Sequence, residues 1–281
     1  MRVGRIPYLN CAPVYGAVDR GIVTLDAELV SGVPSTLNRG MADGTIDVSV
    51  VSAVEYARDA NRYLLLPDLA ISCSGPVRSV MLFSTRPAHE LSGAQVLVSR
   101  SSMTSVALLE LLFEHVWKAT PTFVPGDAEA DDLRRDQSDV AARLVIGDAA
   151  LMLRHAEHPV AIAHGRAYPF VYDLGAEWKA WTGLPFVFAV WVARREVNLR
   201  DALQVHAALM ESRNWGLANL SRLADEASAS CQLPPHVVQE YLAGLDYGLG
   251  LEYLEGLSEF FRRLELAGRV PQGKLVFLPA A

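Results

Sequence analysis

The chain has 281 residues, of which 51% are hydrophobic, and its formal net charge is −7. This length fits two domains better than one simple core, and the apolar content excludes a largely disordered chain. The basic residues are few and scattered, so we expect no nucleic-acid partner. Three widely spaced cysteines, Cys11, Cys73 and Cys231, indicate neither a disulfide framework nor a metal-binding knuckle.

No apolar run approaches the roughly 18 residues that a membrane-spanning helix needs. The residues after Met1 also lack the apolar segment of a signal peptide. We therefore expect a soluble, cytoplasmic protein with no membrane partner. The sequence is compatible with a monomer or a homodimer.

The first 60 residues alternate between strand and helix patterns. Strands are expected at residues 3–8, 25–30 and 46–51, and helices at residues 13–19, 34–42 and 53–60. Such alternation predicts a largely parallel sheet. Three further strands, at residues 63–66, 69–72 and 77–84, follow without a helix and indicate mixed or antiparallel pairing.

A second cycle of strands and helices begins near residue 95. Strands are expected at residues 95–99, 122–124, 143–146 and 170–173, and helices at residues 104–117, 148–154 and 177–181. A long apolar strand at residues 186–194 is expected to cross back to the first domain. From residue 199 the chain is predicted to be helical, with one buried face marked by Leu251, Leu254, Leu257, Phe261 and Leu264.

These elements predict an α/β protein with two lobes and a ligand cleft between them. Lobe 1 is expected to comprise residues 1–86 and 190–281, and lobe 2 to be an inserted α/β domain at residues 87–189. Two connections, with hinges near residues 85–91 and 188–194, would let the lobes close on a ligand.

Short polar segments follow several of the predicted strands, where α/β proteins gather their ligand sites. Tyr8 and Asn10 come just after the first strand. Ser79 lies in an apolar strand, where a buried hydroxyl needs a partner. The neighbouring Arg78 is expected to face the opposite side. Each of these residues fits a structural role in the turn or core as well as a ligand contact.

Three predicted helix starts carry hydroxyls or a carboxylate. Ser102, Thr104 and Ser105 surround the start of the helix at 104–117, where unpaired N–H groups and the helix dipole favour an anion. Gly147 and Asp148 open the helix at 148–154, and Ser35 follows Pro34 at another. Ordinary helix capping is the alternative explanation for each.

Metal and cofactor chemistry have little support in the sequence. His155, His158 and His164 lack a further ligand in register, so we expect no metal site. No glycine-rich nucleotide loop or serine-hydrolase motif is present. We therefore expect no cofactor.

A set of motifs in a specific order resembles the chorismate dehydratases of the futalosine route to menaquinone. They are Tyr8-Leu9-Asn10, Gly44-Thr45-Ile46-Asp47, Ser52-Ala53-Val54-Glu55-Tyr56, Val77-Arg78-Ser79-Val80, Ile146-Gly147-Asp148-Ala149-Ala150-Leu151, Asp173-Leu174-Gly175 with Trp178, and Thr182-Gly183-Leu184-Pro185-Phe186. The resemblance implies a fold like that of type II periplasmic binding proteins. It also implies removal of water from chorismate to give 3-[(1-carboxyvinyl)oxy]benzoate.

By the same resemblance, Asn10 and Ser79 are expected in the active site. The turn at residues 102–105 and Gly147-Asp148 are expected to bind substrate. Because the motifs offer no obvious catalytic His or Lys, we hypothesise that the substrate's own side-chain carboxylate takes the ring proton. Asp148 as the base is the rival hypothesis.

Two other functions stay open at this point. One is the sibling enzyme of the same pathway, 1,4-dihydroxy-6-naphthoate synthase, which shares the two-lobed fold. The other is a non-catalytic binding protein for a small anion, which the expected lack of an export signal disfavours.

Overall fold

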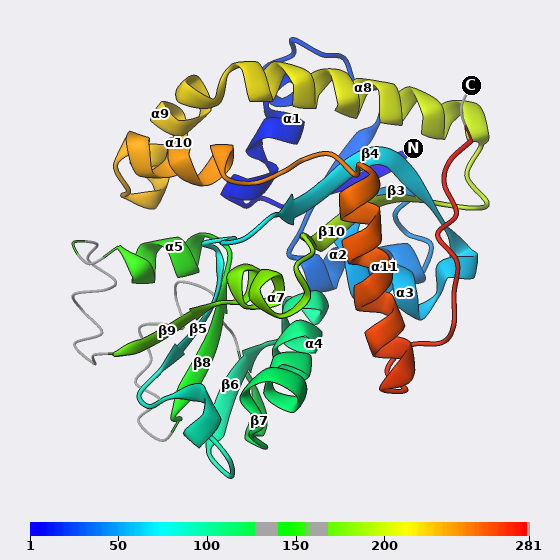
Figure 1. The fold of residues 1–281 in the computed structure, drawn as a ribbon. Coiled ribbons are helices and arrows are strands. Elements are labelled where there is room, and N and C mark those ends of the chain that lie inside the picture. Colours follow the sequence, from blue (N-terminus) through cyan, green and yellow to red (C-terminus); the bar gives the residue numbers. More distant parts are fainter. Residues whose placement is uncertain (127–139, 156, 158–167, 280–281) are drawn as a thin grey trace.

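Two five-stranded sheets, each covered by helices, lie one above the other in Figure 1. The structure is a computed structural model that describes residues 1–126, 140–155, 157 and 168–279. Its two separate sheets with flanking helices confirm the predicted two-lobed α/β architecture.

The first sheet has the strand order β2-β1-β3-β10-β4. The first three strands of the chain pair in parallel, as the alternation predicts, and β10 runs antiparallel to both of its neighbours. The strands of this sheet are β1 (Arg2–Arg5), β2 (Glu28–Ser31), β3 (Val48–Ser52), β4 (Tyr63–Cys73) and β10 (Phe186–Arg194).

Strand β4 is continuous, whereas the sequence predicts two strands separated at Pro67 and Asp68. Strand β10 pairs with β4 on both sides of that break, and a register shift accommodates the extra residues as a bulge. Proline lacks a backbone N–H and Asp68 has a φ of 56°, so both suit a bulge better than a regular ladder. Pro67 and Asp68 therefore mark a bulge within one strand and not a turn between two strands.

The second sheet has the strand order β7-β6-β8-β5-β9. Strand β6 pairs in parallel with β7 and β8, and β5 runs antiparallel to β8 and β9. The strands are β5 (Val80–Ser84), β6 (Gln95–Ser99), β7 (Thr122–Gly126), β8 (Ala142–Ile146) and β9 (Phe170–Asp173).

The chain passes between the sheets earlier than the predicted lobe boundaries. Strand β5 pairs along its whole length with β8 and β9, although the sequence boundary at residue 86 assigns it to lobe 1. Strand β10 pairs with the first sheet from Phe186 onward, although residues up to 189 are assigned to lobe 2. We therefore propose that the connections lie at residues 74–79 and 183–185, in place of the predicted hinges.

Ten α-helices are present in the described part of the chain. They are α1 (Ala12–Asp19), α2 (Pro34–Ala42), α3 (Ala53–Arg58), α4 (Met103–Leu112), α5 (Asp148–Arg154), α7 (Leu174–Thr182), α8 (Leu199–Ala218), α9 (Leu220–Cys231), α10 (Pro235–Ala243) and α11 (Leu251–Leu266). Short turns of other helix types are η1 (Leu9–Cys11), η2 (Ala60–Arg62), η3 (Ala88–Glu90) and the π-helical η4 (Phe113–Trp117). Proline in the first turn of α1, α2 and α10 fits its fixed φ and missing donor.

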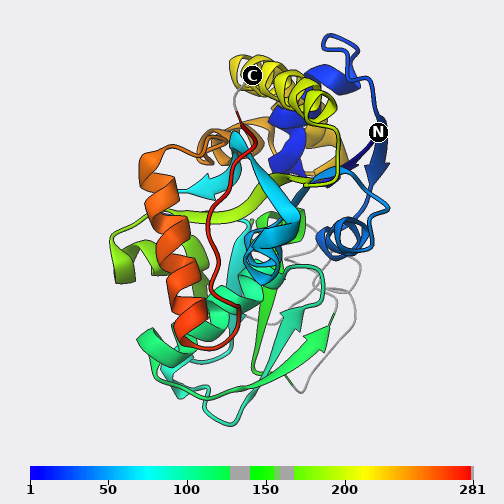
Figure 2. The same cartoon turned by 90° about the vertical axis from the view of Figure 1, so that its right-hand side faces the viewer.

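The C-terminal helices cover the first sheet and reach toward the second lobe. Helices α8, α9 and α10 lie over the first sheet with α1, and α11 descends beside α3 and α4 (Figure 1). The end of the chain then runs back along β4, where the N–H of Leu65 donates to the carbonyl of Val276 at 2.8 Å (Figure 2). Of the predicted buried face of α11, Leu257, Phe261 and Leu264 are buried, but Leu251 is 87% exposed because it is the first residue of the helix.

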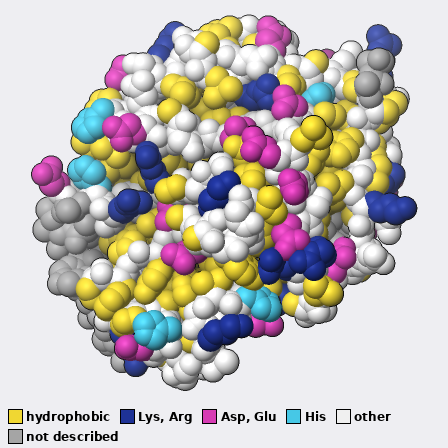
Figure 3. All heavy atoms as spheres, viewed as in Figure 1, with side chains coloured by type: hydrophobic (Ala, Val, Ile, Leu, Met, Phe, Trp, Pro, Cys, Tyr) yellow, Lys and Arg dark blue, Asp and Glu magenta, His cyan; other side chains and the backbone are white. Residues whose placement is uncertain are grey.

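One apolar core extends through both lobes, with Trp178, Trp191 and Tyr15 among its largest buried side chains. No helix of the described residues is both long and apolar enough to span a bilayer. On the face seen in Figure 3, arginine and lysine side chains are interspersed with aspartate and glutamate.

Candidate functional site

A narrow cleft of about 60 Å³ lies where the two sheets face each other, and both lobes contribute to its lining. Apolar side chains of β4 and β10, Ile71, Phe188 and Ala189, form part of its wall. The polar side chains that line it are Tyr8, Asn10, Ser52, Ser79, Ser102 and Ser105. Among the described residues lining the cleft there is no Asp, Glu, His, Lys, Arg or Cys, so it offers neutral hydrogen-bonding groups beside an apolar wall.

Six of the nine site residues expected from the sequence meet in this cleft: Tyr8, Asn10, Ser79, Ser102, Ser105 and Gly147. Ser35, Thr104 and Asp148 are not among its lining residues. The sequence analysis missed Ser52, which ends β3, and the apolar wall. The position of Ser52 at a strand end was a usable signal, because Tyr8 and Asn10 were found by that rule.

Asn10 lies in η1, just after β1, and presents an amide to the cleft. Its Oδ1 atom is buried and has no hydrogen-bond partner among the described residues. Buried polar atoms are nearly always paired, so an orphaned acceptor in a cleft suits a ligand that brings its own donor.

Ser79 directly precedes β5. The sequence predicted it inside a strand at residues 77–84, so this position is a correction. The Asp173 carboxylate, which also caps α7, accepts the backbone N–H groups of Val77 and Arg78 at 2.9 and 2.7 Å. Arg78 has a left-handed φ of 64° and its Nη1 donates to the carbonyl of Glu240 at 3.0 Å. The guanidinium is therefore directed to α10 and not to the cleft, while Ser79 lines it.

The start of α4 combines capping with cleft lining. The Ser102 hydroxyl oxygen accepts the Ser105 N–H at 3.3 Å, and the two hydroxyls are 2.8 Å apart. Thr104 has a different task, because its Oγ1 accepts the Val54 N–H of the other lobe at 3.2 Å. Thr104 therefore makes a contact between the lobes, and it is not among the residues that line the cleft.

Gly147 needs to be glycine for a backbone reason. Its φ of 62° and ψ of −146° fall in a region of backbone conformation that residues other than glycine rarely adopt. A Cβ atom here would stand 3.3 Å from the Tyr8 ring. Its N–H donates to the Ser79 carbonyl at 2.7 Å, so this residue connects two walls of the cleft.

Asp148 faces a second, larger hollow of about 370 Å³ beside the cleft. Its Oδ1 accepts the Leu9 N–H at 3.1 Å, across the lobes. Burial raises the pKa of this carboxyl to about 6, against the smaller lowering effect of the Leu9 hydrogen bond. The same hollow is lined by two ion pairs, Arg5 with Asp19 and Arg20 with Glu226.

Asp148→Asn is expected to stabilise the protein at pH 8 by about 2 kcal/mol. The folded-state pKa of about 6 exceeds the ordinary 3.8, so the folded protein holds this proton more tightly than the unfolded chain. Stability therefore falls as the pH rises from about 4 to about 6. The full shift corresponds to about 3 kcal/mol, and the side chain's partial exposure to the hollow reduces it.

Urea denaturation of both proteins at pH 4 and pH 8 measures this effect. Asparagine can still accept the Leu9 N–H. A gain in stability at pH 8 without a gain at pH 4 would therefore come from removing the negative charge. An equal gain at both pH values would contradict the assignment.

The histidines considered as metal ligands do not form a described site. His158 and His164 lie outside the described residues. Within the part of the chain that is described, no group of three or more His, Cys, Asp or Glu side chains could hold a metal ion.

The chain has a two-lobed fold of the periplasmic-binding-protein-like class. The alkanesulfonate-binding protein SsuA of Xanthomonas axonopodis pv. citri superposes with a TM-score of 0.68 at 15% identity, over 98% of this chain and 96% of that one. At this identity the likeness concerns the fold alone.

The sequence assigns the chain within this class. A family model described as menaquinone biosynthesis matches residues 1–266. A chorismate dehydratase of Thermus thermophilus is 34% identical over 266 residues, 92% of this chain and 93% of that protein. A 1,4-dihydroxy-6-naphtoate synthase of the same organism is 25% identical over 95% of both. The chain belongs to the menaquinone biosynthesis family.

Proposed function

We propose that this protein is an enzyme that removes water from chorismate to give 3-[(1-carboxyvinyl)oxy]benzoate, and that it does so in the cytoplasm. Family membership and the 34% identity to a chorismate dehydratase support the dehydratase over its sibling, which is 25% identical. The observation that carries the mechanism is a cleft with polar neutral side chains and an apolar wall.

The reaction can proceed with such a sparse site because the substrate supplies the driving force. Loss of the ring hydroxyl and of the adjacent ring proton produces one water molecule and a benzene ring. The protein's task is to hold two carboxylates, orient the breaking bonds and exclude bulk water. We infer that the substrate's side-chain carboxylate takes the ring proton, since no lining side chain among the described residues is a suitable base at neutral pH.

The cleft residues then take complementary roles. Ser79 donates a hydrogen bond to the departing ring hydroxyl, and the proton taken up by the substrate's carboxylate passes to that hydroxyl to complete the water molecule. Asn10 offers an N–H donor to a carboxylate and the unpartnered Oδ1 acceptor to a substrate hydroxyl. Ser102 and Ser105 bind the other carboxylate at the positive end of α4.

The lobes must open for this substrate to enter. The cleft of about 60 Å³ is far below the roughly 300 Å³ at which ordinary ligand sites begin. Two hydrogen bonds join the lobes next to it, from Leu9 N–H to Asp148 and from Val54 N–H to Thr104. Both involve single donors, so they can break and re-form during turnover.

The proposed activity is tested by incubating the protein with chorismate. We expect the diene absorbance to fall while an aromatic acid with the product's mass accumulates. Binding without conversion would indicate a solute-binding protein. No binding and no conversion would favour the sibling synthase.

Asp148→Asn separates the two candidate bases. If the substrate's carboxylate takes the proton, kcat is expected to stay within about threefold of the parent, because Asp148 faces the second hollow and not the cleft. If Asp148 is the base, turnover is abolished while chorismate still binds. Single-turnover rates together with equilibrium binding distinguish these results.

A further inference from the structure

Two phenol groups are buried on α10 and on the loop that follows it. Tyr241 is 1% exposed and Tyr247 is 2% exposed. Neither hydroxyl makes a hydrogen bond of acceptable distance and angle with the described residues. Because an unsatisfied buried hydroxyl destabilises the folded protein, each needs a physical explanation.

Tyr241 lies on α10, the helix that is attached to the turn carrying Ser79. The preceding residue on α10, Glu240, accepts the Arg78 guanidinium through its carbonyl at 3.0 Å, so helix and turn are fixed to each other. Burial raises the pKa of Tyr241 well above its ordinary value, and the nearby Ser79 side chain is the effect that opposes this rise. The phenol is therefore protonated at any working pH and is available as a donor.

Among the residues that the structure describes, Ser79 has no strong hydrogen-bond partner. Its hydroxyl lies 3.5 Å from the Val77 carbonyl, at the limit of a hydrogen bond. A small rotation about the Cα–Cβ bond frees it from that contact. Ser79 Oγ can then accept one proton and donate its own in a different direction.

We propose that Tyr241 is a positioning residue for Ser79: its hydroxyl donates to Ser79 Oγ, so that the Ser79 proton points at the departing hydroxyl of the substrate. This role rests on the proposed dehydratase function. Tyr241 transfers no proton, because the phenolate it would leave is disfavoured by burial and by the nearby Asp148 carboxylate. Its contribution is the orientation of one hydrogen bond.

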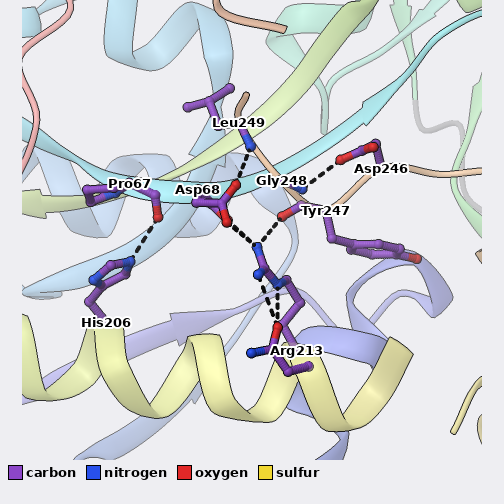
Figure 4. A network of polar contacts seen from close by, with 9 residues as sticks. Pro67, Asp68, His206, Arg213, Asp246, Tyr247, Gly248 and Leu249 are labelled. Carbon is purple, nitrogen blue, oxygen red and sulfur yellow. Dashed lines mark hydrogen bonds and ion pairs between the residues drawn. The ribbon is translucent and has the colours of Figure 1, made fainter. Parts of the chain in front are cut away.

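The loop after α10 is held firmly enough to support such positioning. Arg213 of α8 donates through Nη1 to the carboxylate and carbonyl of Asp68 and to the carbonyl of Tyr247 (Figure 4). The Asp68 carboxylate in turn accepts the Leu249 N–H at 3.1 Å. Asp246 pairs with Ser72 of β4 through both backbone groups. The end of α10 is thus attached to the first sheet.

Tyr241→Phe tests the inference, since it removes one oxygen and keeps the ring. We expect kcat for chorismate to fall about tenfold, the size of one neutral hydrogen bond, with KM within about twofold. In a Ser79→Ala background the same change is expected to have almost no further effect on kcat. A purely structural role would lower kcat by the same factor in both backgrounds.

Tyr247→Phe is the matched control, because it removes a neighbouring buried hydroxyl that has no link to Ser79. It is expected to leave kcat within about twofold. An unchanged kcat in Tyr241→Phe, or additive effects of Tyr241→Phe and Ser79→Ala, would overturn the inference.

The same four-protein cycle in urea unfolding gives a readout that needs no substrate. We expect the effects of the two substitutions on the free energy of unfolding to be non-additive, because the two hydroxyls share a hydrogen bond. If the parent protein does not convert chorismate, the proposed function fails. In that case, additive changes in the free energy of unfolding would still reject the hydrogen bond between Tyr241 and Ser79.

Discussion

Ser79→Ala is expected to lower kcat for chorismate dehydration by about 100- to 1,000-fold, with a small change in KM. That is the usual effect of removing one oriented donor from a site where charge develops. Ser79 is 2% exposed and lies at the junction of the lobes, where water cannot replace its hydroxyl once the cleft is closed. Steady-state kinetics with chorismate give both constants.

Ser84→Ala is the matched control for this change. Ser84 is another buried serine, at the far end of β5 from the cleft. Its hydroxyl donates to the Arg86 carbonyl at a distance of 2.6 Å. We expect its kcat to stay within about twofold of the parent, although its stability will fall. Equal turnover of Ser79→Ala and the parent protein would remove Ser79 from the chemistry.

The strands of this protein could be predicted well where a single apolar run carries the information. Residues 95–99, 170–173 and 186–194 were predicted as strands with the same bounds that the structure shows. The helix at 174–182 was predicted to start three residues late. Its cap, Asp173, also binds the N–H groups of residues 77 and 78, which is a contact that local sequence does not reveal.

The candidate site divides along the same line. The rule that polar residues after strands gather at one edge found Asn10 and the α4 serines, whereas Ser79 was found as a hydroxyl in an apolar segment. It could not tell Thr104 from Ser105, because the two differ only in which lobe their hydroxyls meet. No local pattern in the sequence pointed to Tyr241. Its helix lies some 160 residues from Ser79 in the chain and could be recognised only as part of the C-terminal helical region.

The bulge in β4 is held by contacts with a residue that is distant in the sequence. Arg213→Met is expected to lower the free energy of unfolding by about 3 to 4 kcal/mol. The Arg213 side chain is only 10% exposed and satisfies the Asp68 carbonyl, the Asp68 carboxylate and the Tyr247 carbonyl at once. Methionine retains much of the packing volume but leaves those acceptors without their donor.

Arg222→Met is the control, because Arg222 is an ion-paired arginine on α9 whose side chain is 59% exposed. Exposed pairs contribute about 0 to 1 kcal/mol, so its unfolding midpoint in urea should hardly move. Similar losses in the two variants would mean that charge removal in general, and not the buried network, destabilises the fold. A loss confined to Arg213→Met would show that the left-handed Asp68 and the loop before α11 are held by a residue of α8, 145 positions along the chain from the bulge.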